Sequence, residues 1–489
     1  MPVDLTKRAD QVDITSDAYK ALLAGLQANI LKSHGRNASR QVFLRFTGSA
    51  GDVRKWIREK VAPRVLTAAV QMEHAEKRRA DKDFDGGIVI LLSLSAAGYS
   101  YLGFDPKKFK SDAFRKGMKD QDDSVIDGVL GTKNRDPEPA AWEPGFQKTI
   151  HAMVTLADDQ ASATRLLNEL SLLRTEVAGV AEIVAVDEGR TLRRPRPSTP
   201  DPDDFEPIEH FGYFDGISQP LFTQQDLKDY YDKKVGTGPG IGWDPAASLD
   251  MLLVADPFAT AADAYGSYLV YRKLYQDYGL FHGRVATCAG AIGASADLAG
   301  AMVVGRFPDG TPVMDSDKPI KDYTNDFVFE TGDEKGYRCP RHAHIRKVNP
   351  RGTTPLTSLE NEKRRRIARR GIPYGKPMPG LCEASTPTDP NPSADRGLLF
   401  MCYQANIEKQ FEFIQRTWVD NPNFPTQLIG GKDTGDDPLI GQDKNENQRW
   451  PKKWGDEASG KTEFNFEAAV TLKGGEYFFS PSKPFLLAL

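Results

Sequence analysis

The stretch from Ile88 to Ala97, IVILLSLSAA, is the longest apolar run of the chain. It is much shorter than the roughly 20 apolar residues that a membrane-spanning helix needs, and it suits a buried strand. We therefore predict a strand over residues 88–95 in the interior of a globular protein. We expect no transmembrane helix and no membrane partner.

Segments with helical and strand periodicity alternate around this run. The predicted elements are a helix at 17–33, a strand at 40–46, helices at 52–61 and 65–79, strands at 88–95 and 149–156, a helix at 160–173 and a strand at 180–187. The order strand, helix, strand followed by strand, helix, strand is typical of a ferredoxin-like sheet with helices on one face. The first half is therefore predicted to be α+β.

Residues 193–209, RRPRPSTPDPDDFEPIE, are rich in proline and charge and have no apolar period, so they indicate a boundary. We predict an N-terminal domain at residues 1–205 and a C-terminal domain at 206–489. After the boundary come a strand at 267–274, apolar runs at 297–306 and 396–404, and a helix at 407–419. This order allows the second half to repeat the plan. The polar, glycine-rich stretch 429–461 is predicted to be a surface loop.

The composition is that of an ordinary globular protein, with 39% apolar and 27% charged residues among 489. Lys and Arg number 64 against 68 Asp and Glu, so the net charge of −4 gives no support for a nucleic-acid partner. Four cysteines, at 288, 339, 382 and 402, form no C-x-x-C pair. We read them as scattered reduced thiols, not as a zinc site or a disulfide framework.

The start of the chain, MPVDLTKRADQVDITSD, has no apolar segment of the kind found in signal peptides. We therefore expect a cytoplasmic enzyme, while export without a visible signal stays open. A homo-oligomer is also left open.

The segment His210–Pro220, HFGYFDGISQP, places Asp215 between two glycines and next to aromatic residues. Glycine lets a backbone turn sharply and approach a flat ligand closely. An aspartate held there would be partly desolvated, so its protonation would respond to its surroundings. The plain alternative is an Asp–Gly turn.

The segment Cys339–Arg351, CPRHAHIRKVNPR, offers His342 and His344 together with several cations. A neutral imidazole is the usual proximal ligand of haem iron, and guanidinium groups match the two haem propionates. His-x-His also occurs in zinc and copper sites, but no further His or Cys stands at short spacing to complete one. A basic, solvated loop is the remaining alternative.

The run Arg364–Gly375, RRRIARRGIPYG, has five arginines in seven residues and resembles a nucleic-acid patch. Aromatic residues for base stacking are not interleaved with it, which disfavours that interpretation. The strand Arg396–Gln404 would carry Leu398 and Phe400 on one face, and alone it would be core.

Together these segments resemble the dye-decolorizing peroxidase family, in its long bacterial branch. Gly212–Gly216 matches the family's G-x-x-D-G motif, Ala343–Arg351 resembles its axial-histidine segment, and Arg369 before Ile372–Gly375 resembles its distal arginine segment. Gly397–Gln404 is similar to the strand that lines the distal pocket, and Leu26–Arg36 looks like another family segment. The matches run in the family's order.

The resemblance implies two ferredoxin-like domains with antiparallel sheets and peripheral helices. It implies haem b (iron protoporphyrin IX), held mainly by the C-terminal domain, and hydrogen-peroxide-dependent oxidation of bulky dyes and phenols. Asp215 would move the peroxide proton, Arg369 would stabilise the separating charge, and His344 would ligate iron. A carboxylate as the proton carrier suggests an acidic optimum.

The remaining implied roles surround these three residues. Arg346 and Arg351 would contact the propionates, and Leu398 and Phe400 would form the apolar distal wall. One aspartate of Gly435–Leu439 would support His344, without a choice between the two. The resemblance also implies surface radical sites for bulky dyes, with these candidates: Tyr374 and Trp418, the latter equally well a buried aromatic.

Several alternatives stay open at this point. His342 could replace His344, and a shifted register could replace Arg369 by one of its neighbours Arg365, Arg366 and Arg370. Some relatives have asparagine where this chain has Gly371, so manganese oxidation is doubtful. A non-enzymatic haem carrier or sensor on the same fold is the competing function.

Overall fold

The structure is a computed structural model. It describes residues 3–120, 135–159, 163–196, 204–214, 217–232, 243–320, 323–354, 358–383, 394–425, 434–442 and 447–489. Asp215 and Gly216 of the G-x-x-D-G motif therefore lie outside the described residues.

The first half contains a four-stranded antiparallel sheet in the order β2-β3-β1-β4. The strands are β1 (Ala38–Phe46), β2 (Val89–Leu94), β3 (Ala152–Asp158) and β4 (Ala181–Arg190). Its helices are α1 (Asp17–Gly25), α2 (Ala50–Trp56), η2 (Ile57–Val61), α3 (Ala68–Ala80), α4 (Ala96–Tyr101), α5 (Asp112–Lys116), α6 (Pro144–Gln147) and α7 (Ala163–Glu176). This is the ferredoxin-like order that the sequence predicted.

The second half repeats the plan in the order β14-β8-β11, followed by two short strands beside β11. The strands are β8 (Tyr265–Gln276), β9 (Ala368–Arg369), β10 (Ile372–Tyr374), β11 (Gly397–Gln404) and β14 (Val470–Ser480). Its helices are α8 (Gln224–Asp232), α9 (Tyr278–Ile292), α10 (Ala296–Val304), α11 (Phe329–Gly332), α12 (His344–Val348), α13 (Leu359–Lys363), η8 (Glu408–Val419) and α14 (Lys483–Ala488).

Shorter strands complete the secondary structure. They are β7 (Val254–Ala255), which pairs with β8, the hairpin of β5 (Leu192–Pro195) and β6 (Phe205–Ile208), and the hairpin of β12 (Gln448–Pro451) and β13 (Lys461–Phe464). The β5–β6 hairpin crosses the predicted domain boundary at residues 205 and 206. That boundary stays a prediction.

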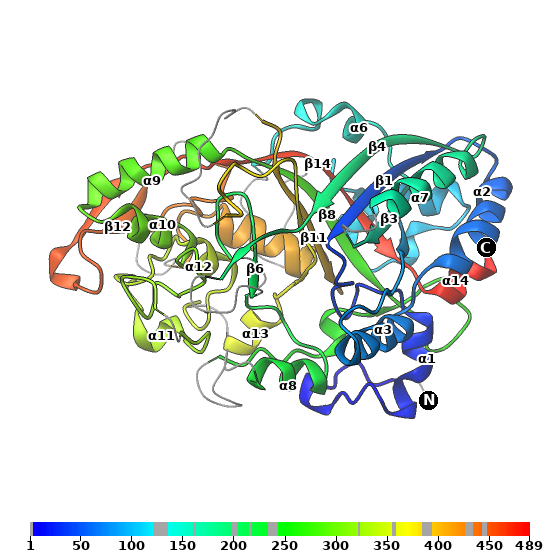
Figure 1. Ribbon diagram of the computed structural model, residues 1–489, viewed down its shortest axis with the longest axis horizontal. Coiled ribbons are helices and arrows are strands. Elements are labelled where there is room, and N and C mark those ends of the chain that lie inside the picture. Colours follow the sequence, from blue (N-terminus) through cyan, green and yellow to red (C-terminus); the bar gives the residue numbers. More distant parts are fainter. Residues whose placement is uncertain are drawn as a thin grey trace.

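The two sheets close into one barrel. Leu94 pairs with Phe479 to join β2 to β14, and Gly189 pairs with Tyr374 to join β4 to β10. A continuous apolar core with side chains from both sheets fills the space between them. In Figure 1 the strands of the barrel occupy the centre and right, α9 to α12 and β12 extend to the left, and both chain termini lie on the right. The fold class is α+β with two ferredoxin-like units, as predicted.

Some predicted elements differ from the structure. The helix predicted at 17–33 ends at Gly25, because the chain turns extended at Leu26 and Asn29 has a positive φ of 70°. The apolar run 297–306, for which no element type was predicted, is mostly helix α10, and helix α9 was not predicted. The stretch 429–461 is not simply a surface loop, since Asp436, Asp437 and Trp450 are buried.

Among the described residues, no single helix is long and apolar enough to cross a membrane, although α9 and α10 together, bent by 109°, would pass by length and composition.

Candidate active site

A cavity of about 260 Å³ lies against the outer face of β8 and β11. On these paired strands Leu398 lies opposite Leu274 and Phe400 opposite Arg272, and all four side chains line the cavity. The residues between them on β11 point the other way, into the barrel core, because side chains alternate along a strand. The predicted apolar wall of Leu398 and Phe400 therefore faces an open space.

His344, the first residue of helix α12, lines the same cavity with 23% of its side chain exposed. Its Nδ1 lies 2.8 Å from Oδ2 of Asp437, whose side chain is fully buried. The other oxygen of Asp437 accepts from the backbone N–H groups of Leu439 and Ile440, which fixes the carboxylate. A carboxylate here favours the proton on Nδ1 and leaves the Nε2 lone pair available for a metal.

Of the two aspartates that the sequence left open, Asp437 and not Asp436 contacts His344. Asp436 accepts from Nη1 of Arg135 at 2.7 Å. His342, the alternative to His344, is fully buried with its ring 4.2 Å from that of Trp450, and it does not line the cavity. Burial lowers the pKa of His342 well below its ordinary value.

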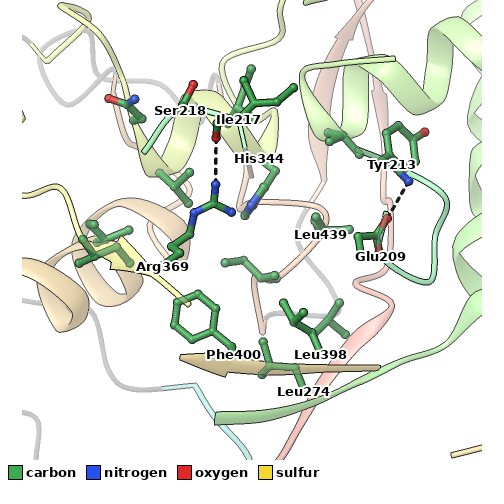
Figure 2. Close-up of a pocket in the computed structure, with 18 of the residues that line it drawn as sticks. Glu209, Tyr213, Ile217, Ser218, Leu274, His344, Arg369, Leu398, Phe400 and Leu439 are labelled. Carbon is green, nitrogen blue, oxygen red and sulfur yellow. Dashed lines mark hydrogen bonds between the residues drawn. The ribbon is translucent and has the colours of Figure 1, made fainter. Parts of the chain in front are cut away.

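Arg369, in β9, projects into the cavity from another side (Figure 2). Its Nη2 donates to the carbonyl of Ile217 at 3.0 Å, and its backbone N–H donates to Oε1 of Gln219 at 3.1 Å. In Figure 2, His344 and Arg369 point toward one space above Leu398, Phe400 and Leu274. Arg369 is thus hydrogen-bonded to Ile217 and Gln219, which follow Asp215 closely in the sequence.

Hydrogen bonds stabilise the turn that leads to Asp215. Glu209 accepts from the backbone N–H groups of Phe211 and Tyr213, each at 2.9 Å, and Gly212 takes a positive φ of 94°. The N–H of Phe214 donates to the carbonyl of Pro308 at 3.0 Å. Gly212 therefore provides the sharp turn that the sequence predicted for a glycine of the motif. The described part of this turn ends at Phe214, directly before Asp215.

Two buried arginines line the cavity close to each other, Arg351 and Arg306. Both donate to the side-chain oxygen of Asn325, and Arg351 also donates to the carbonyls of Asn325 and Phe327. Their hydrogen-bond acceptors in the described part of the chain are all neutral oxygens. Burial lowers the pKa of Arg306 to about 10 and, with Arg306 nearby, that of Arg351 to about 9. This corner of the cavity favours an anion.

Arg346 lies elsewhere and does not line the cavity. Its fully buried guanidinium donates to the carboxylate and carbonyl of Asp333 and to the carbonyls of Cys339 and Glu334, above the ring of Phe329. The predicted propionate contact of Arg346 is therefore disfavoured, because its guanidinium lies outside the cavity. Arg306, which the sequence did not single out, lines the cavity instead.

Tyr374 and Trp418 are both buried, which disfavours surface radical sites at these positions and, for Trp418, agrees with the alternative of a buried aromatic. Tyr374 is 5% exposed, since β10 lies between β11 and β4, and its hydroxyl donates to Asp395 at 3.0 Å. Trp418 is 3% exposed and its ring stacks on that of Phe424 at 5.3 Å.

The arginine run does not form a basic surface. Arg364 pairs with Asp250 at 2.8 Å, and Arg365 lies over the ring of Phe413. Arg366 and Arg370 are half-buried and donate to backbone carbonyls, of Asp244–Ala246 and of Asn29 and Ile30. This placement disfavours nucleic-acid binding through the run.

Asp420, at the end of η8, is buried behind the cavity and accepts from Gln415 Nε2 at 3.0 Å and from the backbone N–H of Gln442 at 3.1 Å. Burial raises its pKa to about 7. An acid whose pKa is raised in the folded state favours folding at low pH and loses that contribution as the pH rises through the folded value.

We compare the free energy of unfolding of the Asp420→Asn variant with that of wild type at each pH. This difference should be more favourable to the variant at pH 8 than at pH 5, by on the order of 2 kcal/mol, because the amide cannot ionise. Urea unfolding at both pH values measures the difference. Asp83→Asn, at an exposed position, is the control. An equal difference between variant and wild type at both pH values would contradict the assignment.

Comparisons with known proteins identify the family of this chain. A family model described as Dyp-type peroxidase, C-terminal, matches residues 301–429, which include His344, Arg369 and β11. The multifunctional dye peroxidase DyP2 of Amycolatopsis sp. is 36% identical over 496 residues, covering all of both chains. The chain belongs to the dye-decolorizing peroxidase family. It is thus an oxidoreductase of the peroxidase class.

Solved structures of this peroxidase family have the same fold. The DyP-type peroxidase of Anabaena sp. superposes with a TM-score of 0.82 at 38% identity, covering 96% of this chain and 95% of that chain. DyP2 from Amycolatopsis sp. superposes with a TM-score of 0.83 at 34% identity, covering 100% of both.

Sequence reasoning missed Arg306 and Glu209, which line this peroxidase's cavity, and Asn325, which binds Arg306 and Arg351 beside it. Arg306 follows the apolar helix α10, and Asn325 lies in an irregular segment, so neither stands in a pattern that points to a site. Glu209 directly precedes the segment His210–Pro220, which contains the G-x-x-D-G motif. This position in the sequence was the one signal that could have identified a missed residue as part of the site.

Proposed function

We propose that this peroxidase binds haem b in the cavity between His344 and Arg369 and uses hydrogen peroxide to oxidise aromatic dyes and phenols. The observation that carries the proposal is the His344–Asp437 pair, which aims one imidazole into an apolar cavity. When bound, haem supplies the redox-active iron that reacts with peroxide.

The donor set fits this cofactor. No cluster of three or more His, Cys, Asp or Glu side chains that could hold a metal occurs among the described residues, so His344 would be the single protein ligand of an iron held by a porphyrin. The walls of Leu398, Phe400 and Leu274 suit an apolar ring. Arg306 and Arg351 supply cationic donors for two propionates.

The residues on the opposite side from His344 would handle charge and protons. Arg369, with Nη2 bound to Ile217, is already oriented toward the cavity and would stabilise negative charge that develops as the peroxide bond breaks. Asp215, by family resemblance, would take a proton from one peroxide oxygen and return it to the other.

The test is a visible absorption spectrum of the purified protein, followed by dye oxidation with and without peroxide at pH 4 to 5. We expect a haem band and peroxide-dependent turnover. A protein that binds haem but oxidises no dye would favour a carrier or sensor, and a protein with no haem would refute the proposal.

Asp437 should tune His344 by accepting its Nδ1 proton. We expect Asp437→Asn to lower haem affinity or peroxide reactivity by about 10–100-fold, the usual cost of losing a carboxylate behind a metal-bound histidine. Haem titration and stopped-flow absorbance measure the two quantities. Asp436→Asn, which alters the adjacent carboxylate, should leave both within about threefold. Equal effects in the two variants would mean that general destabilisation, and not the His344 contact, is responsible.

A further inference from the structure

Three consecutive residues, Ile217 to Gln219, join the two polar parts of the cavity. Ile217 and Gln219 accept hydrogen bonds from the guanidinium and the backbone N–H of Arg369. Between them, the Ser218 hydroxyl accepts from Arg351 Nη2 at 2.9 Å and from Asn325 Nδ2 at 2.9 Å. Figure 2 shows the Ile217 carbonyl facing Arg369, while the Ser218 hydroxyl points to the other side.

The backbone of Ser218 has a φ of 63°, in the left-handed region that serine rarely adopts. A conformation of this kind persists only when its surroundings fix it. Here the fixing contacts are those of the Ser218 side chain with Arg351 and Asn325, and Asn325 is itself buried. The turn at Ser218 directs the preceding carbonyl toward Arg369.

We propose that Ser218 and Gln219 are positioning residues that hold Arg369 in its cavity-facing orientation. Ser218 fixes the Ile217 carbonyl, which accepts from the Arg369 side chain, and Gln219 fixes the Arg369 backbone. The inference deepens the proposed function, since it rests on Arg369 acting there. It also connects the arginine pair to Arg369 through two adjacent residues, since Arg351 and Arg306 donate to the Ser218 hydroxyl and Arg369 donates to the Ile217 carbonyl.

The first experiment needs no cofactor. Hydrogen–deuterium exchange of the backbone N–H of Arg369 is compared in wild type, Gln219→Leu and Gln219→Glu. Leucine removes the acceptor and glutamate keeps it. We expect exchange to become about tenfold faster in the leucine variant and to stay near wild type in the glutamate variant, because a lost hydrogen bond releases the N–H. Unchanged exchange in the leucine variant would overturn the role of Gln219.

The second experiment uses the haem-bound protein and fluoride, a small anion that binds iron and accepts hydrogen bonds from a nearby guanidinium. Ser218→Gly removes the hydroxyl but tolerates the positive φ. We expect the fluoride dissociation constant of the haem-loaded fraction to rise about tenfold. Ser316→Gly, at a half-buried serine outside the cavity, should behave like wild type.

The outcomes separate the inference from the proposed function. Wild-type fluoride affinity in Ser218→Gly would overturn the role of Ser218. If the wild-type protein bound no haem, the proposed function would fail, while deuterium exchange would still decide whether Gln219 holds Arg369.

Discussion

Replacing His344 by alanine should abolish normal haem binding and lower peroxide-dependent dye oxidation by more than about 100-fold, because removal of the ligand itself should cost more than removal of its supporting carboxylate. Among the described residues that line the cavity, none other than His344 is a histidine, and His342 does not line it. Haem content per chain and the absorption spectrum of the purified variant measure the effect.

Added imidazole should restore part of the lost absorption in the His344→Ala variant, because a free ligand can enter the space that the side chain leaves. His342→Gln is the matched control, and it should keep its haem even if its stability falls, since that ring packs against Trp450. A His344→Ala protein with wild-type haem content and spectrum would refute the ligand assignment.

Replacing Asp215 by asparagine should slow the reaction with peroxide by about 10²–10⁴-fold, the range that a positioned proton carrier contributes. Haem content should remain near wild type, because the roles proposed for binding haem lie with His344, Arg306 and Arg351. Stopped-flow mixing with peroxide, followed by absorbance, separates the reaction rate from cofactor loading.

Arg369→Leu provides the comparison for this variant. Loss of one charge-stabilising donor should cost about 10²–10³-fold. If the two residues act on the same step, the double variant should be much less impaired than the product of the single effects. A wild-type rate in Asp215→Asn would show that another group carries the proton, and Glu209, which also lines the cavity, would be the next to test.

Much of the fold could be predicted because apolar periodicity is a local property. The strands β1 to β4, β8 and β11 follow from it, and so does the order that defines a ferredoxin-like unit. The closure of the barrel could not be predicted, since it depends on one residue pair at each join, Leu94 with Phe479 and Gly189 with Tyr374. Pairings so distant in sequence leave no periodic signal.

The candidate site, like the fold, could be predicted only in part from the sequence. His344, Arg369, Leu398 and Phe400 line one cavity and stand in recognisable segments. The partner of His344 could be narrowed to two aspartates but not chosen, because Asp436 and Asp437 differ only in the direction that each side chain takes. The burial of Tyr374 and Trp418 follows from tertiary packing around β10 and η8, which composition does not reveal.

Strand β11 divides its side chains between the barrel core and the cavity, with Leu399 and Met401 on one side and Leu398 and Phe400 on the other. A slip of one residue against β8 would exchange the two sets completely. Substitutions inside the barrel that loosen this pairing would therefore also disturb the cavity wall, although they touch no residue of it. Substitutions that weaken the pairing of this strand should therefore lower the melting temperature and the activity together.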